Sequence, residues 1–168
     1  MTDRPVVRAI EGARTSAVHL EMRDWYGVDG DDFRAWREGR SYETGPGAWW
    51  YGLVRHAVES GVAVQRARVI SEPASEYIRF EYDITEHNLA AGEEVRWLPR
   101  RLASDLELPT NDFWLIDRHL VIFNLFAADG RWADPPNELS RDEDVVATCV
   151  AAFDAVWARG IPHADYRL

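Results

Sequence analysis

Apolar residues along the chain fall into blocks whose spacing separates helices from strands. From Val62 to Ile70 the block is rich in β-branched residues and predicts a strand. From Trp49 to Ser60 apolar residues recur at helical spacing and Gly61 follows, so this block predicts a helix. The same reasoning predicts helices over residues 74–90 and 141–158, and strands over 93–98, 113–116 and 120–123.

Capping and turn-forming residues predict where these elements begin and end. Asp31 is expected to cap a short helix that Gly39 ends. Pro73 fits the first turn of the following long helix. Ser140 and Glu143 have the spacing of a capping box, so they predict the start of the last helix.

The segments between these blocks are less regular. Residues 117–119 separate two apolar runs and predict an antiparallel hairpin. Residues 17–26 fit a short strand as well as a helix, and the pattern does not decide between them. Residues 1–15 are expected to be a loose start, and loops are predicted over 41–47, 99–101 and 127–136.

Strands that alternate with helices predict an α/β fold, with α+β as the alternative, in which helices flank a mixed sheet. The 168 residues suit a single domain over 1–168 that buries a core without disulfides or metals. Within it, residues 1–61 are expected to form a helical N-terminal part and residues 62–160 an α/β core.

The chain is acidic, with a net charge of −10 and a pI of about 4.9. Binding to nucleic acid needs cationic residues that neutralise phosphates, and an anionic membrane also attracts cations, so we expect direct contact with neither. Cys149 is the single cysteine, and the first residues have no apolar stretch of a signal peptide. No apolar run reaches the length of a membrane span, so a cytoplasmic location is expected.

Motifs of catalysis and of metal or cofactor binding are absent from the sequence. All 19 basic residues are arginines, which excludes a lysine nucleophile. The 5 histidines lack zinc-site spacing, and no phosphate-binding loop or nucleophile elbow occurs. We therefore predict no catalytic residue, no metal and no cofactor. The acidic pair Glu93-Glu94 is expected to be a solvated edge.

A cluster of arginines is the strongest candidate for a ligand site. Arg66 and Arg68 share one face of the strand over 62–70, and Arg79 lies near Tyr82 on the following helix. Three guanidinium groups in a cleft would hold a carboxylate or phosphate. The alternative is internal ion pairing with nearby acids, because unpaired buried charge is costly. These acids are Glu72, Glu81 and Asp83.

Trp49 and Trp50 are the candidates for an interaction surface. Consecutive residues of a helix cannot both face the core, so at least one of the two rings is expected to be partly exposed. An exposed tryptophan suits a protein contact, whereas core filling is the alternative for either ring taken singly. Most of the 8 tryptophans are expected to supply bulk to the core.

Three phrases of the chain resemble one half of a phospholipase D-like α/β domain. They are Glu94–Pro99, Phe113–Asp117 and Phe153–Trp157, and the likeness covers roughly residues 62–160. Phospholipase D enzymes carry H-x-K-x-x-x-x-D; with Asp117 as the aspartate, Thr110 stands in place of histidine and Asp112 in place of lysine. Threonine is no general base and aspartate repels phosphate, so phosphodiesterase activity is not expected.

A second resemblance extends over nearly the whole chain. The phrases His19–Asp24, Arg68–Pro73, Tyr77–Tyr82 and Asn111–Leu115 look like an actinobacterial family of unknown function, domain of unknown function 6879. Genes of this family often lie beside genes of helix-turn-helix regulators. The resemblance therefore implies a regulatory partner and no particular chemistry.

Together these observations favour a non-enzymatic regulatory or interaction domain that works with a helix-turn-helix transcription regulator and senses a small anionic ligand. The alternative is a toxin-like effector or enzyme with a non-standard site around the arginine cluster, Tyr82 and Asp117. A homo-oligomer that associates through exposed tryptophans is a third hypothesis.

Overall fold

A strand near the N-terminus, β1 (Ser16–Glu21), lies in the middle of a mixed sheet. The computed structural model describes residues 4–40 and 48–168. In that part of the chain β1 is joined by β2 (Ala63–Ile70), β3 (Glu94–Pro99), β4 (Phe113–Ile116), β5 (Leu120–Phe126), β6 (Trp132–Ser140) and β7 (Ile161–Pro162) in the order β6-β5-β4-β1-β2-β3-β7. β1, β2 and β3 are parallel, and the remaining neighbours pair antiparallel.

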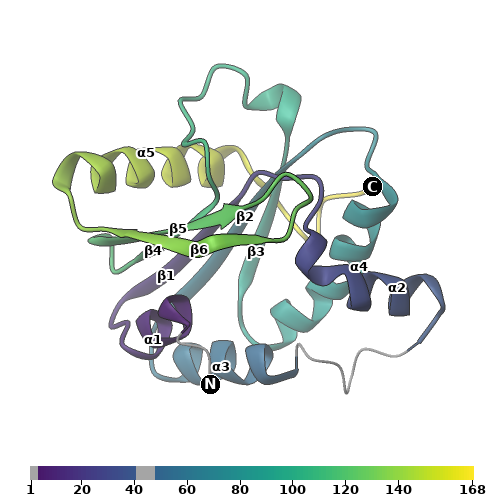
Figure 1. Cartoon of the computed structure of the whole chain (residues 1–168), viewed down its shortest axis with the longest axis horizontal. Helices are drawn as coiled ribbons and strands as arrows, with labels where there is room; N and C mark the ends of the chain where they lie inside the picture. The colour runs from purple at the N-terminus through teal and green to yellow at the C-terminus, as the bar shows by residue number, and fades with distance from the viewer. Residues whose placement is uncertain (1–3, 41–47) are drawn as a thin grey trace.

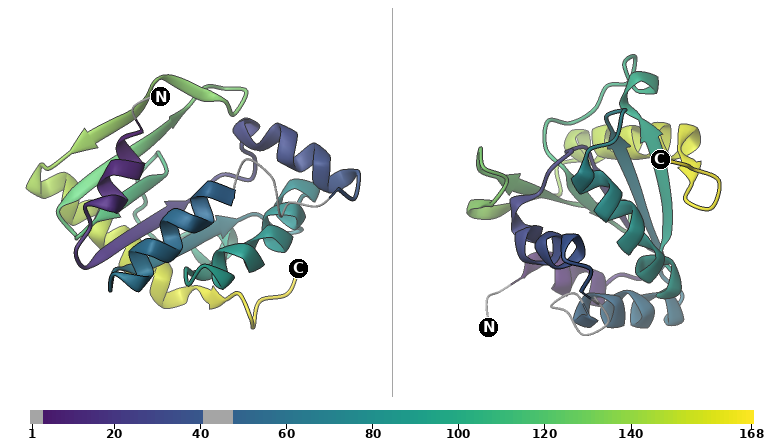
Figure 2. Two further views of the ribbon diagram at one scale, coloured as in Figure 1. Left: turned by 90° about the horizontal axis from the view of Figure 1, so that it is seen from below. Right: turned by 90° about the vertical axis from the view of Figure 1, so that its right-hand side faces the viewer.

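Helices cover both faces of this sheet, as Figures 1 and 2 show. On one face lie α1 (Pro5–Glu11), α3 (Ala48–Glu59) and α4 (Glu76–Ala90), with α2 (Gly30–Arg37) packed against α4. The opposite face carries α5 (Glu143–Arg159). The connection from β1 to β2 contains α3, and the connection from β2 to β3 contains α4. The two helices cover the same face because both crossovers have the same handedness and each leads to the next strand in the same direction across the sheet. We call the two sides the α4 face and the α5 face.

Strand alternation decides which side chains meet each layer. Val18 and Leu20 of β1 and Val69 of β2 point to the α5 face, where they pack with Phe153 and Val156 of α5. The intervening residues of the same strands point to the α4 face. Apolar positions at helical spacing on α5 thus meet apolar positions at strand spacing on the sheet, as binary patterning requires.

The expected α/β class, the mixed sheet and its flanking helices are confirmed. The strand over 62–70, the helix that precedes it and the hairpin over 113–123 are also present. The sheet crosses the boundary expected at residue 62, because β1 supplies its central strand. Of the undecided residues 17–26, residues 17–21 belong to β1, and the expected loose start contains α1.

Two further predictions of local structure are wrong. Residues 127–136 were expected to be a loop, yet β6 begins at Trp132 and runs through Pro135 and Pro136. Proline is tolerated there because β6 is the edge strand, where N–H groups need no partner in the sheet. The expected loop after β3 contains a short 3₁₀ helix, η2 (Arg100–Leu102), and another, η1 (Gly27–Asp29), precedes α2. The expected loop over 41–47 lies outside the described residues.

Helix caps also differ from those expected. Asp142 caps α5 by accepting from the N–H groups of Asp144 and Val145, whereas Ser140 accepts from Asp142 N–H, so there is no capping box. Ser75, not Pro73, begins α4, because its hydroxyl accepts from Ile78 N–H. α2 starts one residue before Asp31, with Asp29 at the N-cap.

The tryptophans divide between core and surface. Trp97 and Trp114 are buried, Trp36, Trp50 and Trp157 pack partly buried against the core, and Trp25, Trp49 and Trp132 are exposed. Most therefore supply core bulk, as expected. None of the helices in the described part of the chain has the length and apolar character needed to span a bilayer.

Candidate functional site

A stripe of charged side chains runs across the α4 face of the sheet and is almost entirely buried. Arg66 and Arg68 extend from β2, and their relative exposures are 7% and 5%. Glu21 of β1 lies beside both, since β1 and β2 pair in a register that sets Glu21 opposite Arg68. Glu81 reaches the stripe from α4. Arg66 and Arg68 share this face because they are two positions apart on β2, and the pairing of Glu21 with Arg68 sets Glu21 on the same face.

Each guanidinium in the stripe has two carboxylate partners. Arg66 Nη1 donates to Glu21 Oε1 at 2.7 Å and Arg66 Nε to Glu93 Oε1 at 2.7 Å. Arg68 Nε lies 2.9 Å from Glu21 Oε2, and Arg68 Nη1 pairs with Glu81 Oε2. Glu93 also accepts from Asn88 Nδ2 at 2.6 Å, so its carboxylate is held on both oxygens. The charges of the stripe are thus paired with one another in an ion-pair network, although Arg68 Nε and Glu21 Oε2 form no hydrogen bond among the described residues.

The charges of the network shift the pKa of its members strongly. Burial favours the neutral form of Glu21, yet Arg66 and Arg68 outweigh it and lower the Glu21 pKa to about 2. Burial disfavours the cation of Arg66 as well, yet Glu21 and Glu93 raise its pKa above the usual range. For the neighbouring His19, burial and the two arginines outweigh the attraction of Glu21 and lower the His19 pKa to about 3. At neutral pH Glu21 and Arg66 are therefore charged and His19 is neutral.

The four residues predicted as a ligand site do not converge. Arg66 and Arg68 adopt the alternative of internal ion pairing, with Glu21 and Glu93 as additional partners and without Glu72 or Asp83. Arg79 lies on the exposed side of α4.

Tyr82, the fourth residue of the predicted set, faces the C-terminal segment. Its hydroxyl donates to the Tyr166 carbonyl at 2.9 Å. Burial beneath the helices leaves no cleft at Arg66 or Arg68, so an anionic ligand cannot reach them without opening the core.

The positions that a phospholipase D would use are also occupied structurally. Asp112 is buried, accepts from Met22 N–H at 2.8 Å and from the Tyr26 hydroxyl, and burial raises its pKa to about 6. Asp117 accepts from the N–H groups of Thr15 and Ser16 at 2.7 and 3.0 Å, and so fixes the start of β1. Thr110 is exposed. These contacts support the fold and leave no acid–base pair for phosphodiester chemistry.

Trp49 and Trp50 lie in the first turn of α3, which begins at Ala48. Trp49 is 48% exposed, with the Arg4 guanidinium 4.8 Å from its ring centroid, whereas Trp50 packs edge-on against buried Trp114 at 5.5 Å. One ring of the pair is thus available on the surface and the other anchors the helix, as the helical geometry predicted.

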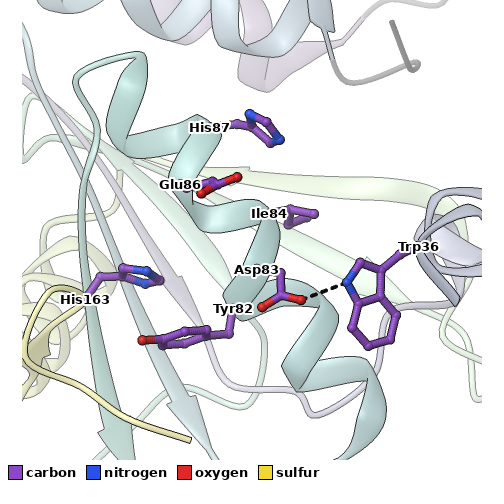
Figure 3. A pocket seen from close by; sticks show the side chains of 7 residues that line it. All are labelled: Trp36, Tyr82, Asp83, Ile84, Glu86, His87 and His163. Atoms are coloured by element: carbon purple, nitrogen blue, oxygen red, sulfur yellow. Dashed lines mark hydrogen bonds between the residues drawn. The ribbon is translucent and has the colours of Figure 1, made fainter. Parts of the chain in front are cut away.

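A shallow pocket opens on the outer side of α4, and Figure 3 shows its lining. The cavity has a volume of about 370 Å³. We call it the α4 pocket; it is lined by Trp36, Tyr82, Asp83, Ile84, Glu86, His87 and His163. Aromatic rings stand on both sides of α4, and the carboxylates of Asp83 and Glu86 lie between them.

A second pocket, with a volume of about 310 Å³, lies at the carboxyl ends of β2 and β3. We call it the strand-end pocket; it is lined by Ser71, Glu72, Arg100, Arg101 and Ser104. Arg100 is fixed by backbone carbonyls of Met22 and Val69 at 2.6 and 3.1 Å. Arg101 is mostly exposed, and its Nε lies 3.4 Å from Glu72 Oε2.

One known protein family matches this chain over nearly its full length. The family model described as "Domain of unknown function (DUF6879)" matches residues 5–168. The chain belongs to this family. The resemblance stated for the phrases at residues 19–24, 68–73, 77–82 and 111–115 is therefore confirmed. No curated protein is significantly similar in sequence to this DUF6879 domain.

Solved structures show what the DUF6879 domain is similar to in fold. Nuc from Salmonella typhimurium, a phospholipase D family member, superimposes with a TM-score of 0.52 at 16% identity, covering 97% of this chain and 89% of Nuc. TrmBL2, an archaeal chromatin protein, gives a TM-score of 0.48 at 13% identity, covering 92% of this chain and 47% of that protein. The likeness to Nuc confirms the expected phospholipase D-like fold and shows the fold alone.

Sequence reasoning missed several members of the DUF6879 domain's buried network. Glu93 was expected at a solvated edge, but it is 2% exposed and paired with Arg66, so only Glu94 faces solvent. Glu21 lies in the segment 17–26, for which the sequence pattern does not decide between strand and helix. The signal that finds Glu21 is register: once residues 16–21 are a strand parallel to β2, alternation puts Glu21 on the face of the arginines.

Proposed function

We propose that this DUF6879 domain is a non-enzymatic interaction module that works with a helix-turn-helix transcription regulator. The observation that supports it is the state of Asp112, which stands where a phospholipase D needs its lysine and is buried against Tyr26 and Met22. A fold of this kind without its catalytic groups retains its surfaces for binding. The family neighbourhood with helix-turn-helix regulators supplies the class of partner.

Charge complementarity supports the same class of partner. The net charge of −10 suits a basic surface, and DNA-binding helices carry such surfaces. Trp49, which is 48% exposed at the start of α3, suits the apolar centre of a protein contact. We propose that the acidic domain covers the DNA-binding surface of the regulator and so competes with DNA.

The test is binding to the purified regulator encoded beside the gene. The two proteins are expected to co-elute, and addition of the domain is expected to weaken the affinity of the regulator for its operator DNA by about tenfold or more. Trp49→Ala is expected to weaken the association, while Trp132→Ala, an equally exposed ring on β6, serves as the matched control. Separate elution together with unchanged DNA affinity would refute the proposal.

The effector alternative has less support from the same residues. Asp117 is held by the backbone N–H groups that precede β1, and Tyr82 donates to Tyr166 at the C-terminal segment. An acid–base site needs its groups within reach of one substrate atom, and these two groups serve different parts of the fold.

The strand-end pocket offers a second candidate function, the sensing of a small anion. It replaces the predicted site at Arg66 and Arg68, since Arg100 and Arg101 are accessible where those arginines are buried. Ser71 and Ser104 add hydroxyl groups to the lining, and an anion would compete with Glu72 for Arg101.

Inorganic phosphate is therefore expected to raise the thermal unfolding midpoint of the domain. Arg101→Gln is expected to remove this stabilisation, because ligand binding to the native state alone stabilises it. Arg40→Gln is the control, since Arg40 is also an exposed arginine paired with a glutamate, Glu38. A midpoint that phosphate raises equally in both variants would show that no site exists at Arg101.

A further inference from the structure

The aromatic walls of the α4 pocket are fixed before any ligand arrives. Trp36 Nε1 donates to Asp83 Oδ2 at 2.9 Å, and the indole stacks on Phe33 with centroids 6.0 Å apart. Tyr82 stacks on His163 at 4.4 Å, and its hydroxyl is held by Tyr166. Figure 3 shows these rings on either side of α4. Because the rings are already held in place, a ligand that binds here would cost little side-chain conformational entropy.

The two carboxylates of the α4 pocket, Asp83 and Glu86, have no ion-pair partner within the described residues. Arg167 lies at the Tyr82 end of the pocket, where its Nη1 donates to the same Tyr166 carbonyl as the Tyr82 hydroxyl. Within the described residues Asp83 accepts only the neutral indole N–H, and Glu86 has no hydrogen bond or ion pair. Arg79, one helical turn before Asp83, forms no ion pair with it, again among the described residues. His163 adds no positive charge, because burial lowers its pKa and its Nδ1 accepts from Trp97 Nε1 at 3.1 Å.

Aromatic rings beside carboxylates that have no ion-pair partner suit a guanidinium group better than an ammonium group. A guanidinium is planar, stacks on indole and phenol rings, is weakly hydrated and donates to two carboxylate oxygens at once. An ammonium is compact and strongly hydrated and gains less from flat walls. We propose that the α4 pocket binds a guanidinium group against its aromatic lining at Trp36, with Asp83 and Glu86 accepting its N–H bonds.

This proposal is independent of the regulator, because it concerns chemistry that the pocket itself offers. The guanidinium has two possible sources, a free small molecule or an arginine side chain of another protein. The cavity of about 370 Å³ accommodates the group with an alkyl stem, which both sources carry. Agmatine stands for the free molecule, and an acetylated, amidated Gly-Arg-Gly peptide stands for the side chain.

The probe is the indole N–H resonance of Trp36 in ¹H–¹⁵N spectra of the full chain at pH 7, assigned with Trp36→Phe. Agmatine is expected to shift this resonance in a saturable way at millimolar concentration. Butylammonium, which has an alkyl stem and an ammonium, is expected to bind at least about fivefold more weakly. Equal binding of both cations, or no saturable shift with agmatine, overturns the proposal.

Charge-neutral variants locate the site. Asp83→Asn with Glu86→Gln is expected to weaken agmatine binding about tenfold or more, and asparagine can still accept the Trp36 N–H. Glu59→Gln with Glu107→Gln removes the same charge from exposed acids elsewhere and is expected to change affinity less than twofold. Equal losses in both double variants would reduce the effect to net charge and overturn the proposal.

The relative affinity of the two probes identifies the source. Tighter binding of the peptide than of agmatine assigns the pocket to an arginine of a partner protein. Tighter binding of agmatine assigns it to a free guanidinium compound. In both cases the regulator can be absent, so failure of the regulator experiment and failure of this one are separate results.

Discussion

Arg68→Ala is expected to lower the free energy of unfolding by about 3–5 kcal/mol, the range for breaking a buried ion pair by removing one partner. The substitution leaves Glu81 and Glu21 buried without the cation that balances them, since Arg68 contacts both. Glu21 keeps Arg66, whereas Glu81 keeps only the Tyr77 hydroxyl at 2.9 Å among the described residues. The substitution therefore removes the attraction of Arg68 for both carboxylates and also leaves the Glu81 carboxylate buried without a cation. Both effects lower the free energy of unfolding.

Urea unfolding at pH 7 measures this loss, and α4 supplies the control. Arg79→Ala removes the same side chain from the exposed side of that helix and is expected to cost less than about 0.5 kcal/mol. Arg68→Met with Glu81→Leu is expected to recover part of the stability, because an apolar pair leaves no unmatched charge. A loss for Arg68→Ala as small as that for Arg79→Ala would show that the network is not the stabilising element described above.

Acidification from pH 6.5 to 4.5 is expected to destabilise the protein, and His19 is the main cause. Its pKa is about 3 in the folded chain against 6.5 when unfolded, so in this window the unfolded chain binds a proton that the native state refuses. Each pH unit across this window lowers the unfolding free energy by up to about 1.4 kcal/mol. Glu21, whose pKa falls from 4.5 to about 2, adds a loss in the same direction only below pH 4.5.

Asp112 acts in the opposite direction over part of the same window. Its pKa is about 6 when folded and 3.8 when unfolded, so the native state takes up the proton first and gains stability as pH falls from 6 to 3.8. His19→Gln is therefore expected to abolish or reverse the loss of stability between pH 6 and 4.5. Asp112→Asn is expected to make that loss steeper than in the parent chain.

Urea unfolding at several pH values between 4.5 and 7 measures how the unfolding free energy changes with pH. This pH dependence can be compared between variants even where a substitution lowers the stability equally at every pH. His163, whose pKa is also lowered by burial, remains in every variant and provides a common background. Parallel slopes for the parent chain and His19→Gln would contradict the assignment of acid sensitivity to His19.

Local pattern predicted most of the elements that carry the fold. The β-branched run of β2 and the one-sided apolar repeat of α5 each depend on periodicity, which the sequence contains directly. β6 was missed because its two prolines contradict a strand unless it lies at a sheet edge, and position in a sheet is not a local property. The caps of α2 and α5 lie two residues from those expected, since several acids and serines nearby could each accept the same N–H groups.

The candidate site was predictable only in part. Alternation correctly set Arg66 and Arg68 on one face of β2, but their partners come from β1, α4 and the turn before β3. Pairing across such distances in sequence depends on strand order, which one sequence does not reveal. The α4 pocket could not be predicted for the same reason. Its lining residues Trp36 and His163 come from segments far from α4 along the chain.

The buried charged stripe has a consequence for how the chain selects one arrangement of its sheet. If β1 slipped by a single residue against β2, Glu21 would turn toward the apolar α5 layer and both arginines would lose their shared anion. Apolar side chains alone tolerate such a shift better, because Val18 and Ala17 are both acceptable in a core. The ion pairs therefore penalise misregistered intermediates during folding, and a variant with an all-apolar stripe is expected to gain alternative strand pairings even where it gains stability.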